Sequence, residues 1–143
     1  MEEVTTATED VARALGTLLP QLSSSASALT FAEVDEMARS DATVLLVARD
    51  ESGEIVGSLT LALFRVPTGL RAWIEDVVVD ETRRGGGTGS ALVNEALARA
   101  EAAGARTVDL TSRPSREAAN RLYVKLGFVQ RETNVYRYTV ESE

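Results

Sequence analysis

Cysteine and histidine are both absent from the 143 residues of this chain. Their absence excludes thiol nucleophiles, thiolate or imidazole metal sites and every catalytic triad that relies on histidine. Any acid or base must then be an aspartate, glutamate, tyrosine or lysine side chain, or water. Apolar runs long enough to cross a bilayer are also missing, and the acidic start MEEVTTATED is not a secretion signal. We expect a cytoplasmic protein that binds no metal and no membrane.

Basic residues are in the minority. The chain has 15 Lys and Arg against 22 Asp and Glu, which gives a formal net charge of −7. This balance disfavours nucleic-acid binding, which depends on neutralising phosphates with basic side chains, and it suits a small cationic substrate. With 44% hydrophobic and 26% charged residues the composition is that of a globular protein. The length fits one domain, residues 1–143, with its own core.

Apolar spacing and turn residues predict a mixed α/β fold with about seven strands and four helices, in the order β-α-α-β-β-β-α-β-α-β-β. The predicted strands lie at residues 4–6, 43–50, 54–66, 70–80, 106–112, 128–130 and 134–141. The predicted helices lie at residues 8–22, 30–39, 88–104 and 115–126, with a loop at 22–30 between the first two. Short turns between the three middle strands favour an antiparallel meander. The strand–helix–strand unit at residues 77–110 predicts one parallel pair in this mostly antiparallel sheet.

The stretch RRGGGTG at residues 83–89 places two arginines and four glycines between a predicted strand and a predicted helix. Glycines kept in such numbers usually serve positive φ angles or a close approach to the backbone. At a helix N-terminus they expose N–H groups to an anion, and the arginines add positive charge. A phosphate-bearing ligand is therefore expected. The alternative is a plain tight turn, for which one glycine would be enough.

Two familiar nucleotide loops do not fit this stretch. A P-loop needs a lysine followed by serine or threonine after its second glycine, whereas Gly89 is followed by Ser90 and Ala91. The dinucleotide fingerprint needs glycines at offsets 0, 2 and 5, and Ser90 stands at the third of these places after Gly85 and Gly87. Neither nucleoside triphosphate hydrolysis nor dinucleotide binding is supported.

A third motif does fit. RGGGTG at residues 84–89 satisfies Arg-x-x-Gly-x-Gly and resembles the acyl-CoA-binding motif of the GNAT superfamily of N-acetyltransferases. AANRLYVKLGF at residues 118–128 resembles the second signature of that superfamily, a helix ending in Leu-Tyr-x-x-Leu-Gly-Phe. The predicted order of elements is similar to the superfamily fold over nearly the whole chain. The resemblance implies a GNAT-like fold and an acetyltransferase that uses acetyl-CoA as cosubstrate.

The resemblance also implies where acetyl-CoA binds. The backbone of the strand at residues 77–79 would pair with the pantetheine arm, and the N–H groups of residues 85–90, with the Arg84 side chain nearby, would hold the pyrophosphate. Asn120 could reach the cosubstrate, and Arg116 stands where many relatives carry asparagine, so it could meet a CoA phosphate or point to solvent. The candidate cosubstrate-binding residues are Val77, Val78, Val79, Arg84, Gly85, Gly86, Gly87, Thr88, Gly89, Ser90, Arg116 and Asn120.

Tyr123 and Glu75 are the candidate catalytic residues. By the resemblance Tyr123 is the general acid, and a phenol of pKa about 10 can protonate a departing thiolate of pKa about 8.5. Its place in an apolar helical stripe also fits a plain core residue. An amine of pKa about 10.4 arrives protonated, so a base is needed, and the alternatives are Glu75, Asp76 and water. Glu75 could equally serve only in a salt bridge.

The acceptor is less well defined by the sequence. IEDVVVD at residues 74–80 resembles the matching strand of glucosamine-6-phosphate N-acetyltransferases, where acidic residues face the sugar. In a regular strand Glu75 and Asp76 lie on opposite faces. The candidate substrate-binding residues are Glu33, Asp76 and Arg113, although Glu33 also fits a helix cap. A small primary amine is the expected acceptor, with protein N-termini or lysines, or a non-catalytic acyl-CoA sensor, as alternatives. A homodimer, common in the superfamily, stays open.

Overall fold

The computed structural model describes residues 1–24 and 27–141, so the predicted loop at 22–30 lies partly outside the described residues. The chain divides into two compact units, Met1–Thr111 and Ser112–Glu143. Within the described residues, the first unit holds one sheet and three α-helices, and the second holds one α-helix. None of the helices in the described part of the chain is both long and apolar enough to cross a membrane.

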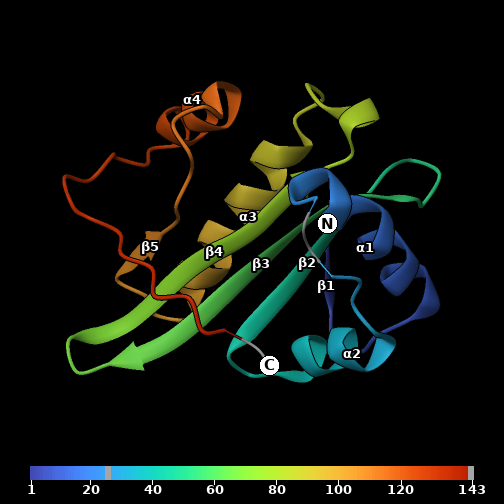
Figure 1. The fold of residues 1–143 in the computed structure, drawn as a ribbon, viewed down its shortest axis with the longest axis horizontal. Helices are drawn as coiled ribbons and strands as arrows, with labels where there is room; N and C mark the ends of the chain where they lie inside the picture. Colours follow the sequence, from blue (N-terminus) through green and yellow to red (C-terminus); the bar gives the residue numbers. More distant parts are fainter. Residues whose placement is uncertain (25–26, 142–143) are drawn as a thin grey trace. The chain divides into compact units, whose positions relative to one another are not determined.

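The sheet of the first unit has five strands in the order β1-β2-β3-β4-β5 (Figure 1). Their bounds are β1 Glu2–Val4, β2 Thr43–Arg49, β3 Ile55–Val66, β4 Gly69–Val79 and β5 Thr107–Asp109. The first four strands pair antiparallel in succession, and β5 pairs parallel to β4. The predicted meander and the predicted parallel pair are thus confirmed. The first strand starts two residues earlier than predicted, and β5 is shorter.

The four predicted helices are present, and a short 3-10 turn precedes the third. Their bounds are α1 Glu9–Leu22, α2 Phe31–Arg39, η1 Glu81–Arg83, α3 Thr88–Ala102 and α4 Glu117–Lys125. Thr8 caps α1, because its hydroxyl accepts the Val11 N–H. Gly104 and Gly127 follow α3 and α4 with φ of 90° and 104°, the left-handed conformation that ends many helices.

Two apolar layers cover opposite faces of the sheet. One contains α1, α2 and the strand residues that face them, namely Val4, Val11, Leu15, Leu18, Val34, Ala38, Leu45, Val47, Ile55 and Val78. On the other face α3 lies so close to β3 that a Cβ atom on Gly57 would come within 3.1 Å of the Leu92 and Thr88 side chains. Since Val78 pairs with Ser58, the neighbour of Gly57, these two layers lie on opposite faces.

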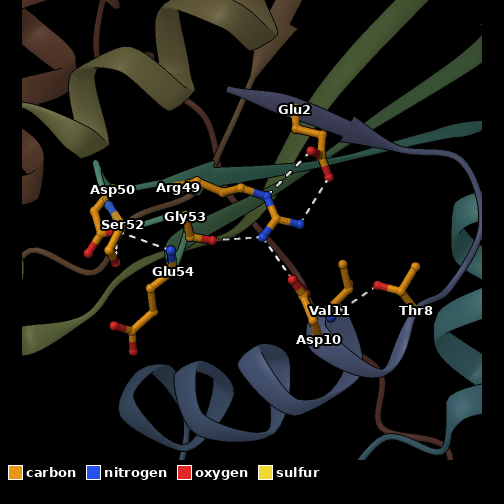
Figure 2. Close-up of polar contacts among 9 residues, drawn as sticks. All are labelled: Glu2, Thr8, Asp10, Val11, Arg49, Asp50, Ser52, Gly53 and Glu54. Atoms are coloured by element: carbon orange, nitrogen blue, oxygen red, sulfur yellow. Dashed lines mark hydrogen bonds and ion pairs between the residues drawn. The ribbon is translucent and has the colours of Figure 1, made fainter.

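Arg49 ties the first strand, the first helix and the β2–β3 turn together (Figure 2). Its Nη1 donates to Asp10 Oδ2 and to the Gly53 carbonyl, each at 2.8 Å, and its other nitrogens contact Glu2. These acidic partners, Asp10 first, raise the pKa of Arg49. The adjacent Asp50 side chain closes the same turn by accepting the N–H groups of Ser52 and Glu54. These contacts join the β2–β3 turn to β1 and to the start of α1.

The predicted closing strands at residues 128–130 and 134–141 are wrong, since no residue from 128 to 141 lies in a strand. The sheet accordingly has five strands and not about seven. Five large valine and tyrosine residues of this segment are 73–91% exposed, namely Val129, Val135, Tyr136, Tyr138 and Val140. Alternating β-branched and aromatic residues suit a pleated, half-buried surface, but a strand exists only where a neighbour completes its hydrogen bonds.

Candidate active site

β4 carries one extra residue near its end. Glu75 pairs with Thr60 and Val78 with Ser58, so two residues of β4, Asp76 and Val77, stand opposite a single residue of β3. Asp76 has a φ of 52° and is the one non-glycine residue with positive φ in the described ranges. This arrangement is a β-bulge with its first residue in the left-handed conformation. The regular two-residue period assumed for Glu75 and Asp76 is therefore interrupted.

The edge of β4 becomes free of a strand neighbour just before this bulge. β5 pairs with β4 only at Arg71, Ala72 and Trp73. From residue 74 to residue 79, no described strand pairs with β4 on the β5 side. Backbone groups on such an edge are available to another extended chain or to an amide-bearing ligand. The strand segment predicted for pantetheine, residues 77–79, lies within this edge.

The glycine-rich loop has the conformation of an anion site. Gly85 and Gly87 have φ of 87° and 85°, which explains the need for glycine there, whereas Gly86 has no positive φ. Within the described chain, the N–H groups of Gly85, Gly86 and Gly87 donate to no acceptor. Successive free N–H groups beside left-handed residues form a concavity that binds anions. The backbone N–H groups of the loop are therefore available to a ligand.

The start of α3 continues this set of donors. Gly87 is the N-cap, no side chain caps the helix, and its first turn contains no acidic residue. The N–H groups at a helix start, here at Thr88, Gly89 and Ser90, have no intrahelical acceptor. They also lie at the positive end of the helix dipole. Loop and helix start together form a surface suited to a phosphate or pyrophosphate.

The two arginines of the loop have different partners. Arg83 Nη2 lies 2.9 Å from Asp50 Oδ2 in the β2–β3 turn. The Ser52 hydroxyl, then the Glu54 and Ser52 N–H groups and Arg83, lower the pKa of Asp50 to about 2. Arg84 Nε donates to the Val79 carbonyl at 3.3 Å, and its terminal nitrogens have no partner in the described chain. Arg84 thus keeps both terminal nitrogens for a ligand, whereas one terminal nitrogen of Arg83 is engaged by Asp50.

Glu75 and Trp73 are brought together on β4. The Trp73 indole N–H donates to Glu75 Oε1 at 2.6 Å, and Glu75 is exposed. Because Glu75 pairs with Thr60, two residues from Ser58, its side chain lies on the face that α1 and α2 cover. Among the described residues no basic side chain forms an ion pair with Glu75, so the indole holds one carboxylate oxygen and the other oxygen is free. That arrangement fits an amine-binding or proton-accepting group.

Glu33 has a structural role. Its carboxylate accepts the Thr30 N–H at 3.0 Å, and the Thr30 hydroxyl accepts the Glu33 N–H at 3.1 Å, which completes a capping box. Hydrogen bonds from Thr30 lower the pKa of Glu33. Of the two roles considered for Glu33, substrate binding and helix capping, the structure shows helix capping. In the described residues, no cluster of three or more acidic side chains is placed to hold a metal ion.

The second unit contains Tyr123 on α4. Tyr123 is buried, and its ring meets Phe128 edge to face with 5.8 Å between ring centroids. Burial raises the pKa of Tyr123 above 10.0, while Arg116 opposes the shift. A phenol with a raised pKa stays protonated at neutral pH and can donate a proton.

The approach to α4 is held by main-chain contacts. The Arg113 carbonyl accepts the Asn120 side-chain amide at 2.9 Å and the Arg116 N–H at 3.0 Å. Arg116 is the N-cap of α4, and its side chain makes no capping hydrogen bond. Ser112 Oγ is buried without a hydrogen-bond partner in the described residues. Sequence reasoning missed this hydroxyl and the bulge at Asp76, and no spacing signal marks either one.

Similarity to known proteins agrees with this geometry. The model of the acetyltransferase (GNAT) family matches residues 11–128, more than half of the chain. An Agrobacterium tumefaciens protein assigned as an acetyltransferase has 27% identity and a TM-score of 0.81, covering 97% of this chain and 100% of that chain. A Trypanosoma brucei acetyltransferase has 28% identity and a TM-score of 0.75, covering 93% and 96%. A Bacillus halodurans transcriptional regulator has 29% identity and a TM-score of 0.78, covering 94% and 97%. No curated protein matches this sequence.

Proposed function

Because the chain belongs to the GNAT acetyltransferase family, we propose that it moves the acetyl group of acetyl-CoA to a primary amine of a small molecule. The observation that carries this proposal is the unpaired edge of β4 beyond Trp73. The chain continues from this strand into α3, whose start has no side-chain cap and no acidic residue in the first turn. An extended amide-bearing arm followed by a pyrophosphate matches these two features in that order. Family members use acetyl-CoA as cosubstrate.

The cosubstrate would bind along β4 and over the loop. Backbone groups of Val77 and Val79 would pair with the pantetheine amides, and the N–H groups of residues 85–90 would hold the pyrophosphate. The terminal nitrogens of Arg84 are unpaired in the described chain, which supports their use on a phosphate oxygen. Asn120 and Arg116 remain candidate contacts from α4.

The transfer would occur by direct attack with both substrates bound, since the chain has no cysteine to carry the acyl group. The amine nitrogen forms a bond to the thioester carbon, and the carbon–sulfur bond breaks. An ammonium acceptor loses two protons: the first goes to Glu75, directly or through water, before the attack. Tyr123 donates a proton to the departing thiolate, and the second proton of the nitrogen then restores the Tyr123 phenol. Backbone N–H groups near Val77 would stabilise the oxygen that becomes negative.

The acceptor would be a small cation. The net charge of −7 favours approach of a positively charged molecule, and the free oxygen of Glu75 suits an ammonium group. Thiol release from acetyl-CoA is the direct assay, with small diamines and amino sugars on one side and peptides with free N-termini or lysines on the other. Turnover higher on the small amines supports the proposal, and turnover only on peptides replaces it with protein acetylation.

Replacement of Tyr123 by Phe tests the acid. Loss of the hydroxyl should lower turnover about 100-fold, which is the usual contribution of one proton transfer, while acetyl-CoA affinity stays unchanged. Since burial raises the pKa of Tyr123, any loss of rate through its deprotonation should occur at higher pH than for an ordinary phenol. Tyr138→Phe is the matched control, because Tyr138 is 91% exposed and should show wild-type turnover. A Tyr123→Phe rate equal to wild type across pH would remove Tyr123 from this role.

One alternative is a sensor that binds acyl-CoA without catalysis. The similarity to a protein described as a transcriptional regulator, at 29% identity, favours it. Calorimetry with acetyl-CoA beside the thiol-release assay separates the two functions. Tight binding without turnover on any amine of the panel would support the sensor.

A further inference from the structure

The glycine-rich loop makes few contacts that could fix its own position. Among the described residues, a Cβ atom placed on Gly85 or Gly87 would meet nothing within 4 Å, and one on Gly86 would meet only the Arg83 carbonyl at 3.6 Å. The N–H groups of these glycines also donate to no acceptor in the described chain. The position of the loop is therefore set by the segments on either side of it, η1 before and α3 after.

η1 in turn has no buried residue of its own. Asp80 shapes this turn, because its carboxylate accepts the Thr82 N–H at 3.0 Å and its carbonyl accepts the Arg83 N–H at 2.8 Å. These contacts join neighbours in the sequence, so they do not hold the turn against another element. Interactions with distant side chains must do that.

Two such interactions are present. The Glu81 N–H donates to Gln21 Oε1 at 2.8 Å, across 60 positions of the chain. Arg83 Nη2 lies 2.9 Å from Asp50 Oδ2. Within the described ranges, no other residue outside 79–84 forms a hydrogen bond or an ion pair with residues 81–83. The first residue of η1 is thus held by α1, and its last residue is held by the β2–β3 turn.

Gln21 is itself fixed on α1. Its Nε2 donates to the Thr17 carbonyl at 3.3 Å, one helical turn earlier. The side-chain amide of glutamine suits this place because it offers a donor to that carbonyl and an acceptor to the Glu81 N–H at once. Leu18 of the same helical turn packs in one core with Val78, near the end of β4. The segment that carries Gln21 is therefore joined to the strand that leads into η1.

We propose that Gln21 is a positioning residue for the cosubstrate. Its hydrogen bond with the Glu81 N–H, together with the Asp50–Arg83 ion pair, holds η1 so that the N–H groups of residues 85–87 are preformed for one anion. Donors that are already in place bind an anion more tightly than donors that must first be ordered. The pyrophosphate of acetyl-CoA as that anion rests on the proposed function, whereas the holding of η1 by α1 does not.

Gln21→Met tests this role, because methionine has a similar length and its sulfur is only a weak acceptor for the Glu81 N–H. Arg13→Met is the matched control, since Arg13 is exposed on the same helix and its side chain has no hydrogen bond or ion pair in the described part of the chain. Asp50→Asn keeps an oxygen for the β2–β3 turn and removes the charge that faces Arg83. Thiol release is measured with acetyl-CoA and with S-acetylpantetheine, a thioester that lacks the pyrophosphate.

The two thioesters should respond differently. Gln21→Met should lower kcat/KM for acetyl-CoA about fivefold, the factor that one hydrogen bond is worth, while kcat at saturation stays within about twofold. Asp50→Asn should lower it about threefold, since an exposed ion pair contributes less. For S-acetylpantetheine, kcat/KM should stay within about twofold in both variants, because that thioester does not use the loop. Arg13→Met should match wild type with both thioesters.

Equal losses with both thioesters would overturn the inference, because Gln21 would then act on the fold as a whole. An unchanged kcat/KM for acetyl-CoA in Gln21→Met would overturn it as well. Should Gln21→Met not fold, Gln21→Ala, which keeps a strong helix former, is measured in its place.

A failure of the proposed function gives a different result. Wild type would then release no thiol from either thioester and bind no CoA. The backbone amide resonances of Gly85, Gly86 and Gly87 without ligand decide the positioning role in that case. Shifted resonances in Gln21→Met, with wild-type resonances in Arg13→Met, support it, and unchanged resonances in both variants overturn it.

Discussion

The helices α2 and α3 begin in opposite ways. At α2 the Thr30 and Glu33 side chains satisfy backbone donors at the start, and an acidic group stands in the first turn. At α3 a glycine is the N-cap, no side chain caps the helix and no acidic residue lies in the first turn. A capping side chain contributes about 1 kcal/mol of helix stability, so its absence at α3 has a cost. The difference indicates that α3 keeps its donors for a ligand, whereas α2 has no such use for them.

Packing explains how α3 can begin without a cap. α3 buries Leu92, Val93, Ala96 and Ala100 against the sheet, whereas the shorter α2 buries only Val34 and Ala38. Burial of an apolar face is the main source of helix stability in proteins, each large side chain contributing about 1.5–3 kcal/mol. That contribution offsets an uncapped start. The longer and better-packed helix can therefore offer its N-terminus to an anion.

The largest expected effect is on CoA binding, when an acidic residue is placed in the first turn of α3 as in α2. Ser90 occupies the third helical position of α3, as Glu33 does in α2. Ser90→Glu should weaken CoA binding about 100-fold, since like charges in contact cost several kcal/mol. The melting temperature should hold or rise, because an acid there favours the helix dipole. Ser90→Gln, with equal size and no charge, is the control for calorimetry, and equal losses in both variants would argue against an anion at this place.

The conformation of the loop should have the next largest effect. Gly87→Ala forces a side chain into a φ of 85°, and CoA affinity should fall about tenfold together with a loss of about 1–2 kcal/mol of stability. Gly86→Ala is the matched control. A Cβ atom on Gly86 would meet only the Arg83 carbonyl at 3.6 Å, an ordinary contact, so affinity and stability should stay near wild type. If both variants bind CoA alike, the left-handed glycines do not shape the site.

The smallest effect should appear at α2 as a pH dependence. Hydrogen bonds from Thr30 lower the pKa of Glu33 below its ordinary value of 4.5. The stability that this capping box adds is therefore fully present above pH 4.5 and is lost as the pH falls through the lower folded value. Urea unfolding of wild type and Glu33→Gln from pH 6 to pH 3 should show a small difference that shrinks towards acid. A difference that grows instead would contradict this assignment, and CoA binding should not change.

The sequence predicted what depends on short-range pattern. The capping box at Thr30 and Glu33 is confirmed because cap and acid are three residues apart and interact within one turn. The left-handed glycines are consistent with the expectation for the loop, and the four helices follow from apolar spacing. The pairing of Trp73 with Glu75 brings together two residues of one strand face, but its hydrogen bond could not be read from spacing alone.

Long-range pairing decided the rest. The residues from 128 to 141 include β-branched and aromatic residues typical of strands, yet they form no strand. A strand also needs a neighbouring strand to complete its hydrogen bonds, and composition does not predict which segment that would be. Asp76 looks like any acidic residue on a strand, and only the register between β3 and β4 puts it in a bulge with a φ of 52°. The sequence by itself determined the helices, the glycine loop and the chemistry available without cysteine and histidine. Tertiary structure decided which peptide groups stay free, because that depends on which strands pair and where the pairing ends.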